Sequence, residues 1–180
     1  MILYVNGDNH TGAVMATNRY INATEDPKYW NLIDRTHPDN LKVSWGVKLA
    51  EMLKMQFHTT HIVDSSNEQI ILDTKKWLDE ATKITNVDVF VIIGWYPVVD
   101  PGPINDLGEL LTEKEIPYLF FHTDIPQQQI NEPVLPTSMI EHLTDIGIEP
   151  VLLSDCYYGN DGHSAWAKYI AKYINKHKLI

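Results

Sequence analysis

The sequence predicts an α/β fold, a doubly wound sandwich in which helices cover both faces of a mostly parallel sheet. Three observations lead to this prediction. Short apolar runs bounded by turn residues recur along the chain, as strands buried on both faces do. Stretches with apolar residues at helical spacing lie between these runs. Strands that alternate with helices pair in parallel, because each helix returns the chain to the starting edge of the sheet.

Four segments show the strand pattern. The first, residues 2–5 (ILYV), is wholly apolar and is followed by Asn-Gly-Asp. Residues 62–64, 87–93 and 116–122 repeat the pattern. In open sheets of this kind functional groups gather at the carboxyl ends of the strands, so the residues that follow each run are candidates for a site.

Three segments show the helix pattern. Residues 43–55 place apolar side chains on one side and charged ones on the other. Residues 67–82 do the same, and Asn67 is expected to cap that helix at its N-terminus. Residues 164–177 have lysines toward the C-terminal end, where the helix dipole favours positive charge.

Three stretches show neither pattern: residues 17–41, 96–112 and 124–137. Each is rich in Pro, Asn and Asp, so we expect long loops or short helical turns there. Because extended segments with fixed φ lose less entropy on ordering, the stretches at 96–112 and 124–137 are predicted contact surfaces.

The composition indicates one globular domain, residues 1–180, with 44% hydrophobic residues and a substantial core. The single cysteine, Cys156, allows neither an intrachain disulfide nor a cysteine-based zinc site. A net charge of -10 repels phosphate backbones and anionic lipid heads, so neither nucleic acid nor a membrane is an expected partner. No run approaches the roughly 18 apolar residues of a membrane span. The N-terminal MILYVNGD lacks the features of a signal peptide, so we expect synthesis in the cytoplasm.

Residues 7–11, Gly-Asp-Asn-His-Thr, directly follow the first predicted strand. A Gly-Asp pair here favours a sharp strand-to-helix turn that presents the next side chain and backbone N–H at a helix start, where anions are favoured. The same residues are also expected if Asp8 and Asn9 only cap a helix. The motif alone leaves both interpretations open.

Similar motifs follow the other predicted strands. Residues 65–67 (Ser-Ser-Asn) come after the second, and their backbone N–H groups with the Asn67 amide could bind an oxyanion. The third ends in Gly94-Trp95-Tyr96, where glycine could let a ligand approach the backbone. Residues 154–163 (SDCYYGNDGH) lead into the last helix, which begins with Ala-Trp-Ala.

This order of motifs resembles the SGNH (GDSL-type) hydrolase superfamily, and it looks closest to short stand-alone forms encoded by tailed phages. The resemblance implies a flavodoxin-like three-layer α/β/α sandwich. It also implies an esterase, lipase or carbohydrate deacetylase that uses a Ser-His-Asp triad, with neither a metal nor an organic cofactor.

The chain departs from this family at positions that matter for chemistry. The nucleophilic serine is replaced by Asn9, and an amide has no hydroxyl with which to form an acyl-enzyme. Gly94 matches the third motif, but Tyr96 stands where the family has an oxyanion-binding Asn. Ser66 stands where the family has a glycine, and the backbone N–H of Ser66 could still donate a hydrogen bond. Trp95 and Tyr96 are the aromatic residues expected to line the cleft.

The last motif can be aligned with the family in two ways. One takes Asp161 and His163 as the triad Asp and His. The other takes Asp155 as the aspartate and places Tyr157 at the histidine position. We favour the second, because it aligns the Trp-Ala helix without a gap and because a missing base would accompany a missing nucleophile.

The sequence gives weaker support to two further kinds of site. His37, His58 and His61 could ligate a metal, but no second pair of carboxylates or histidines is spaced to complete a site. Ser65 and Ser66 could substitute for the nucleophile, but neither has a recognisable base beside it in sequence.

The sequence therefore supports three hypotheses. In the first, the chain has lost acyl-ester hydrolysis and serves as a binding or structural module of a phage particle, with other phage proteins or a surface glycan as its partner, and with self-association allowed. In the alternative, it is a nucleophile-replaced form, natural or engineered, of an active serine esterase or deacetylase. An engineered trap would keep its histidine, so Tyr157 favours the first hypothesis. The third, nucleotide binding, lacks a glycine-rich phosphate loop.

Overall fold

The computed structural model describes residues 1–17, 37–62, 64–81, 83, 87–96, 100–124, 130, 133–152 and 156–180. In this part of the chain, four parallel strands form a sheet in the order β2-β1-β3-β4. The strands are β1 (Ile2–Gly7), β2 (Gln56–Thr59), β3 (Val89–Trp95) and β4 (Tyr118–His122). The helices are α1 (Pro38–Lys42), α2 (Trp45–Leu53), α3 (Asn67–Ala81), α4 (Gly102–Glu113), α5 (Met139–Asp145) and α6 (Asn160–His177).

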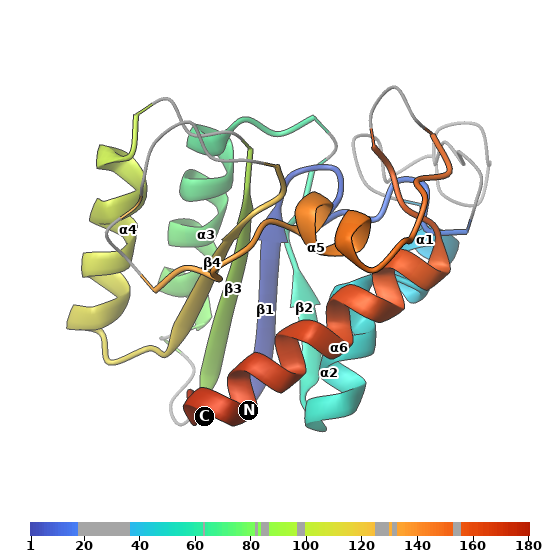
Figure 1. The fold of residues 1–180 in the computed structure, drawn as a ribbon. Coiled ribbons are helices and arrows are strands. Elements are labelled where there is room, and N and C mark those ends of the chain that lie inside the picture. The colour runs from blue at the N-terminus through green and yellow to red at the C-terminus, as the bar shows by residue number, and fades with distance from the viewer. Residues whose placement is uncertain are drawn as a thin grey trace.

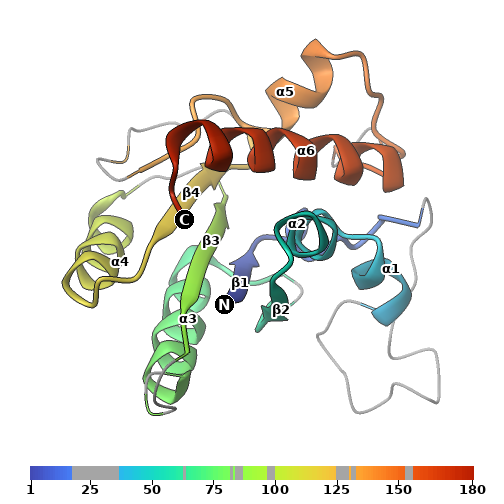
Figure 2. The same cartoon turned by 90° about the horizontal axis from the view of Figure 1, so that it is seen from below.

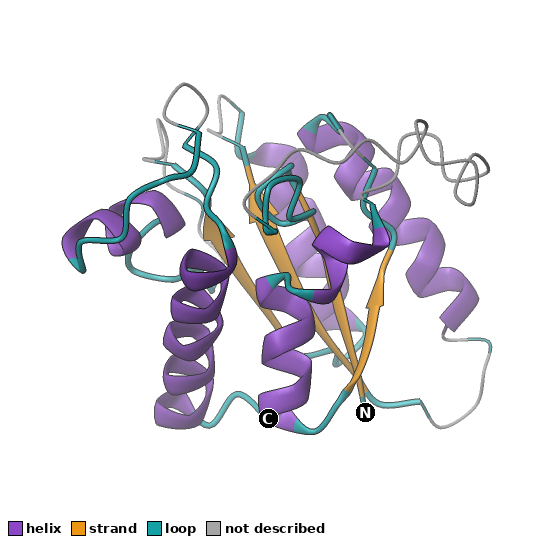
Figure 3. Ribbon diagram, turned by 90° about the vertical axis from the view of Figure 1, so that its right-hand side faces the viewer, coloured by secondary structure: helices purple, strands orange, loops and turns teal. Residues whose placement is uncertain are grey.

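Helices cover both faces of the sheet, which confirms the predicted α/β class. Figure 1 shows α3 and α4 on one face and α2, α5 and α6 on the other, and Figure 3 shows the sheet between these layers. All four strand arrows point to the same edge of the sheet, so the loops after β1, β2, β3 and β4 gather there. None of the helices described is long and apolar enough to cross a bilayer.

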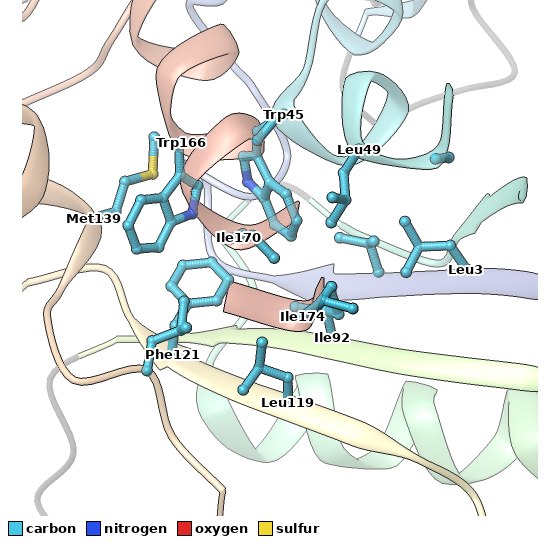
Figure 4. Close-up of a cluster of buried hydrophobic side chains, with 14 of the residues drawn as sticks. Leu3, Trp45, Leu49, Ile92, Leu119, Phe121, Met139, Trp166, Ile170 and Ile174 are labelled. Atoms are coloured by element: carbon cyan, nitrogen blue, oxygen red, sulfur yellow. The ribbon is translucent and has the colours of Figure 1, made fainter. Parts of the chain in front are cut away.

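The core on the α2, α5 and α6 side is built around three aromatic rings (Figure 4). The Phe121 ring on β4 meets Trp45 of α2 edge-on, with ring centroids 5.4 Å apart, and meets Trp166 of α6 at 5.3 Å. All three side chains are fully buried. They fix α2 and α6 side by side over the sheet (Figure 2), and so set where the N-terminus of α6 lies.

The core on the α3 and α4 side contains Trp95, which we predicted to line a cleft. Trp95 is fully buried, and its ring packs edge-on against Phe120 with centroids 5.3 Å apart. It belongs to the same apolar cluster as Ile104 and Leu107 of α4. The prediction for Trp95 is therefore wrong, because successive strand residues point to opposite faces and Trp95 points into the helical layer.

The second strand lies earlier than predicted. It spans Gln56–Thr59 rather than residues 62–64. Within the described sheet, β2 is an edge strand that pairs with β1, and its residues alternate between exposed and half-buried. An edge strand of this kind does not require a continuous apolar run, so the criterion used for buried strands missed it.

The stretch 96–112, predicted to be a loop or short turns, contains most of α4. Pro101 precedes this helix and Pro103 lies in its first turn, where a missing N–H loses no intrahelical bond. Ile104, Leu107 and Leu111 bury the helix against the sheet. From Gly102 onward, this stretch is therefore not the extended contact surface that its prolines suggested, and residues 97–99 lie outside the described residues.

The other two irregular stretches are described only in part. Residues 18–36 lie outside the described residues, and the end of the first stretch forms α1. In the stretch 124–137, the chain runs beside β4: the Phe120 N–H donates to the Pro133 carbonyl at 2.9 Å, and the Leu135 N–H donates to the Phe120 carbonyl at 2.9 Å. This segment covers an edge of β4, while residues 125–129 and 131–132, part of the predicted contact surface, lie outside the described residues.

Candidate functional site

The loop after β1 begins the site. Gly7 has a φ of +151°, a conformation that favours glycine, and it starts a sharp change of direction. The Asp8 carboxylate then accepts the Thr11 N–H at 3.1 Å, and the Asp8 carbonyl accepts the Gly12 N–H at 2.9 Å. Residues 9–17 form turns rather than the helix start that the motif predicted. These bonds hold Asn9 at the carboxyl end of a central strand.

Gly94 supports this loop rather than a ligand. It pairs in register with Gly7 across β1 and β3. A Cβ atom at Gly94 would overlap the Thr11 hydroxyl and the Phe121 ring. The space that we expected a ligand to use is therefore filled by the protein's own side chains.

The Asn9 side chain is 5% exposed and all its polar atoms are hydrogen-bonded. Its Nδ2 donates to Asp64 Oδ1 at 2.6 Å and to the Tyr157 hydroxyl at 3.1 Å. Its Oδ1 accepts the Asp64 backbone N–H at 2.8 Å. The amide therefore joins the loop after β2 to the segment that precedes α6.

Asp64 was not among the predicted site residues. It follows β2 by a few residues, is exposed, and has a φ of +61°. The backbone N–H that meets residue 9 is that of Asp64 and not that of Ser66, where our alignment put it. Ser66 instead caps α3, since its hydroxyl accepts the Gln69 N–H at 3.3 Å, a role that we had predicted for Asn67. The signal for Asp64 was its place at the end of a predicted strand, residues 62–64.

Tyr157 meets Asn9 from the far end of the chain. An antiparallel bridge between Leu152 and Tyr157 holds its backbone, with the Tyr157 N–H donating to the Leu152 carbonyl at 3.2 Å. Its ring packs against the His10 ring, with centroids 4.8 Å apart. His10 is a second residue that our sequence reasoning missed, although it adjoins Asn9.

His163 lies in the first turn of α6, and it is buried. Its Nδ1 accepts the Trp45 N–H at 3.2 Å, and its ring donates to the Tyr158 carbonyl. Burial lowers the pKa of His163 to about 3, and the positive charges of His10 and Lys48 act in the same direction. Nδ1 therefore joins α6 to α2, while the bond to Tyr158 goes to the segment before α6. Tyr157, not His163, is the side chain hydrogen-bonded to Asn9.

The two aspartates of the last motif have different outcomes. Asp161 is exposed in the first turn of α6, and no hydrogen bond between it and Asn9 is found in the described part of the chain. Asp155, the aspartate of the alignment that we favour, lies outside the described residues. Its role stays a prediction.

Asp8 is the buried charge of the site. Burial raises its pKa, but the neighbouring side chains of His10 and Thr123 and the Thr11 N–H outweigh that effect, so the pKa is lowered overall. His10 Nδ1 lies 3.5 Å from Asp8 Oδ2. Asp8 is therefore an anion that holds the loop together.

Tyr96 faces the same cluster. Its backbone N–H donates to Asn67 Oδ1 at 3.2 Å. Burial and the negative charge of Asp8 raise the pKa of Tyr96 to about 12, with smaller contributions from Tyr157 and Asp64. The phenol is thus neutral at physiological pH.

The three histidines weighed as metal ligands lie in separate surroundings. His61 Nδ1 lies 2.8 Å from the Gly7 carbonyl oxygen. The His58 ring stacks on Trp77, with centroids 5.1 Å apart, and the His37 ring caps α1. Among the residues described, no group of three or more His, Cys, Asp or Glu side chains is placed to hold a metal ion.

The two serines weighed as substitute nucleophiles are bonded to backbone. The Ser65 hydroxyl donates to the Ile62 carbonyl at 2.7 Å, and the Ser66 hydroxyl serves as the helix cap. The hydrogen bonds given for these hydroxyls run to backbone groups, and neither involves a histidine. The arrangement thus offers polar groups for binding at the sheet edge, with an amide at its centre.

The chain has an α/β fold with the polar residues around Asn9 at the carboxyl ends of its strands, and this arrangement can be compared with known proteins. No protein-family model matches the chain, and no curated protein matches it. Among solved structures, it is similar to a protein from Desulfitobacterium hafniense DCB-2 assigned to the lipolytic G-D-S-L family, with a TM-score of 0.57 and 13% identity over 95% of this chain and 98% of that chain. The chain therefore shares its α/β fold with that protein.

Proposed function

We propose that this chain has lost acyl-ester hydrolysis and acts by binding, as a recognition or structural module built on an SGNH-type fold. The observation on which the proposal rests is the side chain at the nucleophile position. Asn9 offers an amide whose nitrogen donates to Asp64 and to Tyr157. An amide has no readily ionised proton, and its nitrogen lone pair is delocalised into the carbonyl, so Asn9 cannot attack an ester as a serine does.

The hydrogen bonds given for the Asn9 side chain run to Asp64 and Tyr157, and neither partner is a histidine. Tyr157 occupies the place next to residue 9, and a phenol with an ordinary pKa of about 10 is a poor base at neutral pH. His163, the alternative base, is buried and bonded on both sides. A nucleophile-replaced trap made from an active esterase would retain a histidine beside residue 9, so Tyr157 favours natural loss of the reaction.

The magnitude of the expected loss is large. In a serine hydrolase, removal of the nucleophile alone costs about 10⁶ in kcat and leaves roughly 10³ to 10⁴ over the uncatalysed rate. An Asn in place of that serine therefore leaves no activity of practical use. What remains is the polar surface formed by Asp64, Tyr157 and Tyr96 at the sheet edge.

The partner that we propose is another structural protein of a phage particle or a surface glycan. This part of the proposal is supported by the resemblance to short phage-encoded forms. The net charge of -10 argues against polyanionic partners.

Hydrolysis of p-nitrophenyl acetate at neutral pH tests the loss of activity. We expect wild type to match the buffer background and to match Asn9→Ala. Turnover above background that Asn9→Ala abolishes would contradict the proposal. Turnover that survives Asn9→Ala would place a hydrolytic site elsewhere on the chain or in a contaminant.

Capture from a virion preparation, together with light scattering, tests the binding role. The tagged wild type is compared with Tyr96→Ala/Tyr157→Ala and with Asp161→Ala as a control at an exposed residue of α6. We expect the control to retain the partner and the double variant to lose it. A strictly monomeric wild type that retains nothing would refute the binding role.

A further inference from the structure

A small cavity lies between α3 and the segment that follows β2. Its volume is about 180 Å³, and its walls are formed by Thr60, Asp73, Lys76, Trp77 and Glu80. The last four lie on α3 at the spacing i, i+3, i+4 and i+7, which places them on one face of that helix. The hydrogen bonds given for the Asn9 side chain involve none of these residues. The cavity is therefore a feature separate from the site described above.

Trp77 forms the apolar wall of this cavity, and its ring is held in place from within the protein. The ring stacks on that of Tyr4 with centroids 4.1 Å apart and an interplanar angle of 14°, and on the His58 ring at 5.1 Å. Tyr4 is fully buried, whereas Trp77 is only half-buried. The Tyr4 hydroxyl is also hydrogen-bonded to the Thr60 hydroxyl at 2.5 Å. One buried residue thus positions two walls of the cavity before a ligand binds, which lowers the entropy lost on binding.

The polar groups of the cavity carry both signs of charge. Asp73 and Glu80 are carboxylates, and Lys76 lies between them along the helix. Asp73 Oδ1 accepts a hydrogen bond from Gln69 Nε2 at 3.0 Å, which helps to orient that carboxylate. Two carboxylates disfavour an anionic ligand, and the ammonium group disfavours a cationic one. A neutral ligand with several hydroxyl groups can donate to the carboxylates and accept from the ammonium group at the same time.

We propose that this cavity binds one ring of a neutral sugar. The accessible part of Trp77 contacts the apolar C–H face of the ring, and Asp73, Glu80 and Lys76 bind its hydroxyl groups. The volume is below the range of about 300 to 1,000 Å³ that holds drug-sized ligands, so a single ring has the appropriate size. The site lies outside the Asn9 network, so this inference goes beyond the proposed loss of hydrolysis and does not depend on it.

The affinity for a single ring should be low, because a ligand of this size makes few contacts. We expect a Kd of about 1 mM. Several copies of the chain on one particle would bind more tightly to a surface that displays many such rings, because each later contact is made at a high effective concentration. A weak site of this kind therefore suits recognition of a repetitive glycan.

Two-dimensional proton–nitrogen NMR of the full chain tests the proposal, with the Trp77 indole N–H and the α3 amides as reporters. The probes are the methyl glycosides of glucose, galactose and mannose, and N-acetylglucosamine. Sodium acetate and tetramethylammonium chloride serve as ionic comparisons. We expect saturable shifts at Trp77 with at least one sugar, with a Kd of about 1 mM, and no saturable shifts with either salt.

Two matched variants test which residues bind the sugar. Glu80 and Asp79 are both exposed carboxylates of α3, but only Glu80 lines the cavity. Glu80→Ala should raise the Kd about tenfold, as expected for the loss of one hydrogen bond to a charged group. Asp79→Ala should leave the Kd unchanged.

The possible results lead to different conclusions. A lack of saturable shifts with all four sugars up to about 100 mM would overturn the inference. Saturation by either salt would overturn the assignment of a neutral ligand. A Kd raised equally by Glu80→Ala and Asp79→Ala, or by neither, would overturn the assigned contacts. None of these results bears on the loss of hydrolysis, which the ester assay tests separately.

Discussion

Acid should destabilise this protein through His163 before any carboxylate is protonated. The imidazole is buried between α2 and α6, and its pKa is lowered to about 3 from an ordinary value of 6.5. Below the ordinary value the unfolded chain binds a proton that the folded chain does not bind. Stability therefore falls as the pH drops from 6.5 toward 3, and His163 has little effect above that window.

The size of this effect follows from the shift. Each pH unit within the window costs about 1.36 kcal/mol, because one proton is bound in the unfolded state only. Between about pH 7.5 and about pH 5, His163 should lower the free energy of unfolding by about 2 kcal/mol. Burial also lowers the pKa values of His122 and His142, which act in the same direction. The lowered pKa of Asp8 affects stability only at more acidic pH.

Urea unfolding at a series of pH values measures this loss in wild type and in His163→Asn. Asparagine keeps an oxygen that can accept the Trp45 N–H and cannot be protonated. The variant should be less stable overall, but its pH dependence should be flatter than that of wild type by about 2 kcal/mol across the window. Equal slopes in the two proteins would refute the structural role of His163 and reopen the alignment that makes it the base.

Two further substitutions test the packing and charge of the site. Asn9→Ala should lower the free energy of unfolding by about 1 to 3 kcal/mol through the lost hydrogen bonds of the amide. Asn9→Asp should lower it further at neutral pH, because the new carboxylate then meets that of Asp64. In urea unfolding, the stabilities of the two variants should converge near pH 4, and a lack of convergence would contradict the contact with Asp64. Gly94→Ala should lower the free energy of unfolding by about 1 to 3 kcal/mol, because the added methyl group overlaps Thr11 and Phe121. Adding Thr11→Ala should recover part of that loss in thermal melting. Strictly additive effects of the two substitutions would argue against the overlap.

Much of the fold could be predicted because its central strands are buried on both faces. β1, β3 and β4 coincide with short apolar runs bounded by turn residues, which is the pattern that predicted them. β2 was misplaced because an edge strand carries a different pattern. α4 was hidden by prolines that are tolerated in a first helical turn.

A further signal was present but unused. Ser138 and Glu141 form a capping box at the start of α5, in which the Ser138 hydroxyl accepts the Glu141 N–H at 3.2 Å and Glu141 Oε2 accepts the Ser138 N–H at 3.0 Å. The spacing of Ser and Glu three residues apart is readable from sequence. α5 therefore could have been predicted.

Within the candidate site, only the contacts that follow from the order of the motifs along the chain could be predicted. The meeting of Asn9 with residue 157 follows from the favoured alignment, and the structure places these two side chains in contact. The role of Asp64 depends on loop geometry after β2, including its positive φ. No local sequence pattern specifies which backbone N–H faces residue 9, so the expected donor was assigned to Ser66.

The central claim is that the cleft has no nucleophile able to attack an acyl compound. Incubation with a fluorophosphonate, followed by intact mass and peptide mapping, tests it most directly, with an active serine esterase as the positive control. The account predicts that the mass of the wild-type chain stays unchanged while the control is fully labelled. A stoichiometric adduct on a hydroxyl group next to Asn9, such as that of Tyr157 or Tyr96, would contradict it.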